Sequence, residues 1–238
     1  MKARQLHDWQ MTRDEALQTQ QRLATMVSRR NETGNVSLVA GVDISAPDAN
    51  GRARAAAVVL RYPELALVEA RTVERPVTFP YIPGLLSFRE SPLVLAACEG
   101  LGSEPDLILV DGQGIAHPRR FGLASHLGLL WDRPTVGCAK SKLCGNHEVV
   151  GPEPGSYSDI IDRGEVVGAA LRTKRGASPI YVSIGHKVDL EAAIAIVLSC
   201  CRGQRLPEPS RLAHLAASGR LQPASAQESA PLPRAGAP

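Results

Sequence analysis

The segment Ile108–Gly122, ILVDGQGIAHPRRFG, joins a short apolar run to an acid, two glycines and a group of basic residues. The apolar run predicts a strand buried in the middle of a sheet, and it ends at Asp111. A carboxylate at the end of a buried strand is costly unless a cation, a hydrogen-bond donor or water meets it. Because ligands of open α/β sheets bind outside such strand ends, we expect a functional site at Asp111. The alternative is a simple turn, since Asp-Gly after an apolar run is also a turn signal.

The sequence on both sides of this segment alternates between helical and strand patterns. Helices are predicted over residues 12–30, 92–101, 123–130, 189–201 and 210–217, with a capping box at Thr12 and an N-cap at Asp189. Strands are predicted over residues 36–45, 53–62, 65–74, 106–110, 135–139, 165–172 and 179–185. Turn residues make the first three strands antiparallel and the last two a hairpin, whereas helical crossovers make the middle strands parallel to a neighbour. This order predicts a mixed sheet with helices on its faces, an α/β fold.

Length and composition predict one globular unit. With 238 residues, 44% of them hydrophobic, the chain can bury a substantial core, and we expect one domain over residues 1–220. Residues 221–238 are rich in Pro, Ala and Ser and predict a disordered tail. No apolar run approaches the roughly 18 residues that span a bilayer, and the first residues lack the apolar centre of a secretory signal. We expect a soluble, monomeric, cytoplasmic protein without a membrane partner.

The cysteines favour a reducing compartment. There are five, an odd number, and they lie mostly within apolar stretches, which predicts buried thiols rather than disulfides. Cys138, Cys144 and His147 suggest a zinc site, but no fourth ligand stands nearby and the chain has no Cys-x-x-Cys pair. Ordinary core cysteines are the favoured interpretation.

Basic residues follow two of the predicted strands. A formal charge of +3 permits a nucleic-acid partner without requiring one. Arg119 and Arg120 follow Asp111, and Lys140 and Lys142 follow another apolar run. Each pair alone is usually a solvated surface patch. Two pairs at strand ends close to carboxylates favour a polyanionic partner.

Three acids together predict a metal site. Asp43 ends the first predicted strand as Asp111 ends a later one, and Glu90 supplies a third carboxylate. Carboxylates and substrate phosphate oxygens are the ligands that Mg²⁺ prefers. Glu90 has a competing structural role, because Ser87 and Glu90 match a capping box for the helix that follows.

The segment PYIPG, residues 80–84, is a further unusual feature. Prolines on both sides of Tyr81 and Ile82 stiffen the backbone, and a rigid apolar wedge of this kind can enter between bases. The structural alternative is a loop whose tyrosine packs onto the sheet. Gly112 and Gly114 would let a flat ligand approach the backbone. His117 is equally compatible with metal ligation, acid–base chemistry and a hydrogen bond to nearby backbone.

Taken together, GVDIS, PYIPGLLSFRE, LILVDGQGIAHPRRFGLASHLG and VGCAKSKL resemble endonuclease V, the inosine-directed repair nuclease. The likeness covers residues 11–214, and the DGQG-x-AHPR and PYIPG-x-L-x-FRE segments are highly specific. It implies a ribonuclease H-like fold with strand order 3-2-1-4-5, in which the first and fourth strands are neighbours. It also implies hydrolysis of the second phosphodiester 3′ to a deoxyinosine, with Mg²⁺ as cofactor and Mn²⁺ as a substitute, leaving a 3′-hydroxyl and a 5′-phosphate.

The same resemblance assigns residue roles. Asp43, Glu90 and Asp111 resemble the acidic metal-binding triad, Lys140 resembles the lysine beside the cleaved phosphate, and His214 lies where the family has a late catalytic-site histidine. The implied contacts with DNA and the damaged base are Pro80, Tyr81, Ile82, Pro83, Gly84, Gly112, Gly114, His117 and Arg119. Two rival functions stay open at this point. One is a nuclease of the same fold that acts on inosine-containing RNA or branched DNA. The other is a non-catalytic nucleic-acid-binding module whose acids only cap turns.

Overall fold

The computed structural model describes residues 1–221, and the predicted tail from residue 222 lies outside the described residues. The helices are α1 (Arg13–Ala24), α2 (Leu86–Glu99), α3 (Leu123–Trp131), α4 (Leu190–Ser199) and α5 (Glu208–Ala217). The strands are β1 (Leu38–Ile44), β2 (Arg52–Arg61), β3 (Leu67–Pro76), β4 (Leu107–Val110), β5 (Thr135–Ala139), β6 (Tyr157–Asp162), β7 (Glu165–Leu171) and β8 (Ile180–His186).

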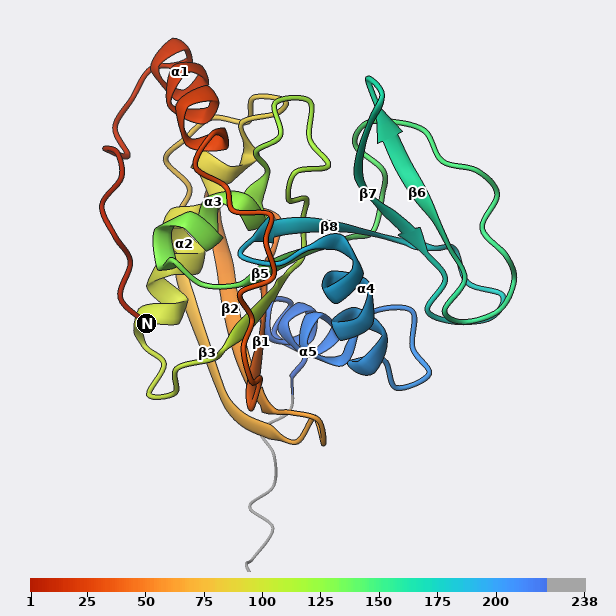
Figure 1. The fold of residues 1–238 in the computed structure, drawn as a ribbon. Helices are drawn as coiled ribbons and strands as arrows, with labels where there is room; N and C mark the ends of the chain where they lie inside the picture. Colours follow the sequence, from red (N-terminus) through yellow and green to blue (C-terminus); the bar gives the residue numbers. More distant parts are fainter. Residues whose placement is uncertain (222–238) are drawn as a thin grey trace, which may run out of the picture.

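All the strands form one eight-stranded sheet of order β3-β2-β1-β4-β5-β8-β7-β6 (Figure 1). Its first part has the expected order 3-2-1-4-5, which confirms the predicted fold class. β1 pairs antiparallel with β2 and parallel with β4, and β5 continues the parallel pairing. The carboxyl ends of β1, β4 and β5 therefore meet at one edge of the sheet.

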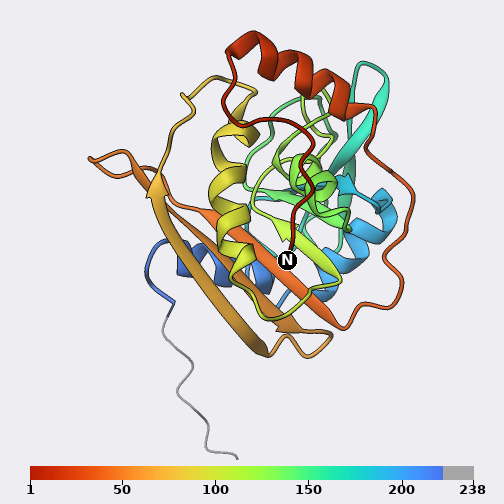
Figure 2. The same cartoon turned by 90° about the vertical axis from the view of Figure 1, so that its left-hand side faces the viewer.

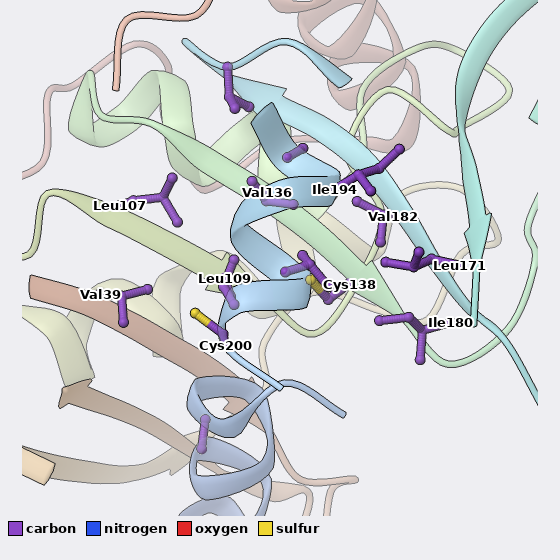
Figure 3. Packing of buried hydrophobic residues seen from close by; sticks show 14 of the residues in the cluster. Val39, Leu107, Leu109, Val136, Cys138, Leu171, Ile180, Val182, Ile194 and Cys200 are labelled. Carbon is purple, nitrogen blue, oxygen red and sulfur yellow. The ribbon is translucent and has the colours of Figure 1, made fainter. Parts of the chain in front are cut away.

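Helices cover both faces of the sheet. On one face, α4 and α5 pack on a core cluster that includes Val39, Leu109 and Val136 (Figure 3). On the other face, α2 and α3 pack on a cluster that includes Val42 and Val110. Figure 2 shows α2 in front of the sheet and α5 behind it. Because side chains alternate between the faces of a strand, every second residue of β1 and β4 points toward α4 and α5.

The start of α2 differs from the prediction. The helix was expected from Pro92, yet it begins at Leu86 and contains Pro92 in its interior. Its N-cap, Leu85, makes no side-chain capping bond, so the predicted capping box of Ser87 and Glu90 is wrong. The proline misled the prediction because prolines favour the first turn of a helix. The correction leaves Glu90 on a regular helical turn without a capping role.

Other boundaries follow the local signals with two exceptions. The capping box of Thr12 and Glu15 and the N-cap at Asp189 are both confirmed. α1, however, ends at Ala24 instead of reaching residue 30. β6 was missed, and it pairs antiparallel with β7 at the edge of the sheet, so β7 lies between β6 and the predicted partner β8. The alternation of exposed and buried residues in β6 is irregular, and this weakens the strand signal.

The cysteines are free thiols, and Cys98, Cys138 and Cys200 are buried. Cys138 of β5 and Cys200 at the C-terminal end of α4 belong to the same core cluster (Figure 3). Cys144 and Cys201 are only partly buried, and within residues 1–221 the cluster of potential metal ligands contains neither Cys138 nor Cys144. None of the helices over this range combines the length and apolar character that a membrane span requires.

Candidate active site

Two aspartates lie at the carboxyl ends of neighbouring parallel strands, Asp43 within the last residues of β1 and Asp111 directly after β4. Val42 of β1 pairs in register with Val110 of β4, so the next residue of each chain segment, Asp43 and Asp111, lies at the same edge. The backbone N–H of Asp111 donates to the carbonyl of Val42 at 3.1 Å, which holds this register. The two acids meet as the strand order led us to expect. The side chain of Asp43 is only 8% exposed and that of Asp111 only 11%, so their charges require compensation.

The alternation of side chains decides which face the site occupies. Val39 and Gly41 of β1 lie on the α5 side, and two residues further along Asp43 shares that side. Leu109 places Asp111 on the α5 side in the same way. The site is therefore built between the strand ends and α5.

α5 brings His214 to the two acids. The Nδ1–H of His214 donates to Oδ2 of Asp43 at 2.8 Å, across 171 positions of the sequence. Gly41 permits this packing, because a Cβ at that position would lie 2.1 Å from the carbonyl oxygen of Pro209 at the start of α5. One donor atom from each of Asp43, Asp111 and His214 lies within 4.8 Å of the others. These three residues are the candidate metal-binding cluster.

Lys140 follows β5 and joins the cluster from the third strand. Its Nζ contacts Oδ2 of Asp111 and lies 3.4 Å from Nδ1 of His214. The side chain is 38% exposed, so the ammonium group borders both the acids and solvent. Such a cation at the open edge of the site is placed to meet a phosphate oxygen.

Burial and mutual repulsion raise the pKa of two acids. The pKa of Asp43 is above its usual value, chiefly through burial and then through the charge of Asp111, while His214 and Lys140 act in the opposite direction. Burial, followed by the charges of Asp43 and Asp111, raises the pKa of Glu90 to about 8. A group of buried carboxyls with raised pKa values is the setting in which a bound cation favours the ionised forms.

Glu90 stands apart from the cluster. It belongs to α2 on the opposite face of the sheet and is absent from the group of donor atoms within 4.8 Å of one another. Glu90 lines a groove together with Ser45, Tyr81 and Arg89. The charges of Asp43 and Asp111 contribute to the raised pKa of Glu90, although its carboxylate is not part of their cluster.

A cavity of about 120 Å³ lies next to the cluster. Gly112, which directly follows Asp111, is part of its wall. The other walls come from the proline-rich loop, from the segment after β4 and from the loop after β5. Lining residues include Tyr81, Ile82, Gly84, Gly112, His117, Phe121 and Leu143. The lining consists mostly of apolar side chains and glycine backbone, which suits a flat uncharged ring.

The proline-rich loop presents one of its two apolar residues outward. Tyr81 is 69% exposed, and the guanidinium carbon of Arg89 lies 6.0 Å from its ring centroid. Ile82 instead packs partly against a small apolar cluster beneath the loop, so the pair does not project outward together as expected. Pro80 and Pro83 are exposed on either side. Tyr81 is therefore the exposed apolar side chain of this pair.

The glycines after β4 have different roles. Gly112 lines the cavity, whereas Gly114 does not. The N–H of Gly114 donates to Oγ of Ser183 at 2.8 Å, and its carbonyl accepts from the N–H of Gly122 at 2.9 Å. A Cβ on Gly114 would lie 1.9 Å from the carbonyl oxygen of Ile184. Gly114 is thus required by packing, and its backbone groups are already paired within the protein.

His117 and Arg119 support the loop that carries Gly84. His117 is buried, and its Nδ1 accepts the backbone N–H of Arg119 at 3.1 Å. Burial, then the charge of Arg119, lowers the pKa of His117 to about 4, so its ring is neutral at pH 7. Nη2 of Arg119 donates to the carbonyl of Gly84 at 2.8 Å. Gly84 has φ +79°, and a Cβ there would lie 2.4 Å from Nη2 of Arg119, so glycine is needed.

Arg120 is engaged away from the site. Its Nη1 lies 2.8 Å from Oδ2 of Asp162, and its Nε donates to Glu165 at 2.6 Å. These ion pairs attach the β6–β7 turn to the segment after β4. The expectation that Arg120 meets phosphate does not fit these contacts.

Two residues with clear roles escaped the sequence analysis. Gln20 of α1 is fully buried and hydrogen-bonds to the carbonyls of Gly84 and Phe121. A signal was available, because Gln20 lies on the apolar stripe of α1 between Ala16 and Leu23. Arg205 also escaped the analysis.

Arg205 supports the lysine of the cluster. Its guanidinium donates to the carbonyls of Lys140 at 2.8 Å and Pro179 at 2.9 Å. It lies in the loop between α4 and α5 and so fixes the backbone that carries Lys140. No local sequence pattern reveals this contact.

The fold and the cluster define a class of protein. A mixed sheet of order 3-2-1-4-5 with acids at the ends of its first and fourth strands is the arrangement of ribonuclease H-like proteins. The sequence model of endonuclease V matches residues 21–215. The chain belongs to the endonuclease V family and is therefore a nuclease.

Relatives and solved structures agree with this assignment. The chain is 54% identical to endonuclease V of Dehalococcoides mccartyi over 92% of its own length and 98% of the relative. Bacillus subtilis endonuclease V has a TM-score of 0.87 at 33% identity, covering 92% of this chain and 96% of that one. Endonuclease V of Ciona intestinalis, solved with a 24mer DNA containing an inosine followed by a ribo-adenosine, has a TM-score of 0.73 at 32% identity, covering 87% and 97% of the two chains.

Proposed function

We propose that this protein is a Mg²⁺-dependent endonuclease that recognises deoxyinosine in DNA and cleaves the second phosphodiester 3′ to it. The observation that carries the proposal is the position of the cavity beside the acidic cluster, with Gly112 in the cavity wall and Asp111 in the cluster. Because Gly112 directly follows Asp111, we expect the phosphates next to a base bound in the cavity to lie near the acids. The inosine-containing DNA bound to the Ciona relative supports this substrate class.

The donor set fits a hard divalent cation. Ligands on opposite sides of Mg²⁺ lie about 4.2 Å apart, given metal–oxygen distances of about 2.1 Å. The donor atoms of Asp43, Asp111 and His214 lie within 4.8 Å of one another, close to that spacing. Carboxylate ligands also suit Mn²⁺, which we expect to substitute. A bound ion would lower the pKa of a water molecule and neutralise charge on the phosphate.

Each residue of the site has a separate role in the proposed reaction. Asp43 and Asp111 hold the cation, and the hydrogen bond from His214 fixes the orientation of the Asp43 carboxylate. Glu90 orients water or assists the cation from the opposite side of the cluster. Lys140 stabilises negative charge on the scissile phosphate. The oxygen of water bonds to phosphorus, the P–O3′ bond breaks, and the 3′ oxygen leaves with a proton.

In this proposal, insertion of Tyr81 into the duplex accompanies extrusion of the base from the stack. Its exposed ring stands at the mouth of the cavity, braced by Arg89. Inserted between the strands, the ring would fill the space that the flipped nucleotide leaves. Extrusion costs least for a poorly paired base, and this favours deaminated purines over normal ones.

The test is a nicking assay on matched duplexes that contain inosine, uracil, an abasic site, a mismatch or no lesion, with and without Mg²⁺. We expect Mg²⁺-dependent nicking of the inosine duplex at the second phosphodiester on the 3′ side. Equal nicking of the undamaged duplex, or nicking unaffected by chelation of metal, would refute the proposal.

A second candidate substrate is inosine-containing RNA. The DNA bound to the Ciona relative carries a ribo-adenosine directly after the inosine. A 2′-hydroxyl near the scissile bond must be either accommodated or excluded. Parallel assays on DNA, RNA and a strand with one ribonucleotide 3′ to inosine separate the two candidates.

A further inference from the structure

Gln20 of α1 has a fully buried side chain that makes three hydrogen bonds. Its Nε2 donates to the carbonyl of Gly84 at 2.9 Å and to the carbonyl of Phe121 at 2.8 Å. Its Oε1 accepts from Nε of Arg119. The partners fix the orientation of the amide, because its oxygen in place of its nitrogen would face two carbonyl oxygens.

Two of these partners, Gly84 and Phe121, line the cavity from two separate segments of the chain, which form two of its walls. Gly84 and Tyr81 come from the proline-rich loop, whereas His117 and Phe121 come from the segment after β4. In the described part of the chain, no backbone–backbone hydrogen bond joins residues 80–85 to residues 117–122. The distance between the walls is therefore set by side chains, and Gln20 contributes from a third element.

The hydrogen bonds of Gln20 act as a clamp between the two walls, and they are costly to break because they are buried. An amide without solvent contact loses about 1–3 kcal/mol for each polar group that is left unpaired. Arg119 reinforces the clamp, because its Nη2 donates to the same carbonyl of Gly84 at 2.8 Å. Removing the amide of Gln20 frees the carbonyl of Phe121 and leaves Nε of Arg119 without its acceptor.

We propose that Gln20 is a positioning residue that holds the two cavity walls together and so determines how strictly the cavity discriminates inosine from undamaged purines. The discrimination part of this inference rests on the proposed function. Gln20 does not touch the acidic cluster, so its effect is on recognition and not on the hydrolytic step.

The decisive variants are Gln20→Leu, which keeps the volume and removes the hydrogen bonds, and Gln20→Glu, which keeps an acceptor for Arg119 and removes both donors. The matched control is Gln21→Leu, the same change at the adjacent, exposed position. For both Gln20 variants we expect the ratio of kcat/KM for inosine over adenine duplexes to fall about tenfold, because displaced walls bind the base less well. The single-turnover rate at saturating enzyme should stay within about threefold of wild type. Gln21→Leu should match wild type.

A second measurement does not depend on the substrate. Hydrogen exchange of the free protein reports the backbone amides of Leu85 and Arg120, which bond within the two walls to Ile82 and His117. We expect about tenfold faster exchange at both in the Gln20 variants and no change in Gln21→Leu. If wild type shows no preference for inosine, the proposed function fails, and the exchange result alone decides whether Gln20 positions the walls. Wild-type exchange in both walls, or lower thermal stability with unchanged discrimination, would overturn the inference.

Discussion

At the scale of single residues, the site combines groups that oppose one another electrostatically. Asp43 and Asp111 lie side by side with little solvent contact, and Lys140 and His214 partly compensate their charges. A protein gains no stability from two buried like charges, so such a pair is expected where a ligand supplies the balance.

The residues proposed to bind the metal are the first to test. Asp43→Asn and Asp111→Asn preserve shape but remove the charge that holds the cation, so nicking of an inosine duplex should fall by about three orders of magnitude. Binding of that duplex, measured by fluorescence anisotropy, should stay within about threefold of wild type, because the cavity is intact. Full nicking by a folded variant would disprove the metal assignment.

Glu90 should lower the stability of the metal-free protein. Its pKa is about 8 in the folded state, against an ordinary value of 4.5. Because the folded pKa is raised, Glu90 hardly changes the free energy of unfolding below pH 4.5. It lowers that free energy progressively as pH rises from 4.5 toward 8. Glu90→Gln should therefore be more stable than wild type by about 4 kcal/mol at pH 7.5 and by about 1 kcal/mol at pH 5. Urea unfolding in chelator checks this, and an equal difference at both pH values would contradict it.

At the scale of elements, the close packing of α5 on β1 places His214. Gly41→Ala would push a methyl group against the carbonyl of Pro209, which is backbone and cannot rotate away. We expect a loss of about 2 kcal/mol in unfolding free energy and about 100-fold in nicking rate. Gly100→Ala is the control, because its Cβ would meet nothing closer than 3.6 Å. Nicking by Gly41→Ala at the control rate would show that the position of α5 is unimportant.

The proline-rich loop is the second element with a testable role. Tyr81→Ala removes the exposed ring but leaves Ile82 packed beneath the loop. Discrimination between inosine and adenine duplexes should weaken about tenfold, since unstacking of a base costs a few kcal/mol and the ring offsets part of it. Competition binding measures this ratio. An unchanged ratio with unchanged stability would make Tyr81 a surface residue without a role in recognition.

At the scale of the whole molecule, buried neutral histidines make the fold sensitive to acid. Burial lowers the pKa of His117 to about 4 and that of His126 well below its usual value. A lowered folded pKa means that stability is complete above pH 6.5 and is lost as pH falls, because unfolding then takes up protons. His126 also holds the N-terminal segment, since its Nε2 lies 2.7 Å from Nε2 of His7.

His126→Phe tests this sensitivity. Wild type should lose about 1.4 kcal/mol per pH unit more than the variant between pH 6.5 and pH 5, the effect of one proton. The raised pKa values of Asp43 and Glu90 act in the opposite direction, but they are common to both proteins and cancel in the comparison. Parallel pH dependences would show that His126 is not titrated on unfolding.

Much of the fold could be predicted because its signals are local. The apolar run before Asp111 marks β4, and the Thr12 capping box marks the start of α1. The start of α2 was misplaced because Pro92 carries a local signal that tertiary packing overrides. β6 was missed because it is an edge strand with an irregular pattern of exposure.

The candidate site also combines features that could be predicted from the sequence with contacts that could not. The sequence by itself determined that acids stand at the ends of two buried strands, because each apolar run and the acid that ends it are adjacent in the chain. Only the tertiary structure decided that His214 meets Asp43 and that Gln20 spans the cavity walls, since those contacts join elements far apart in the chain. Which helix covers which strand end depends on packing across the whole sheet, and no short window of sequence records it.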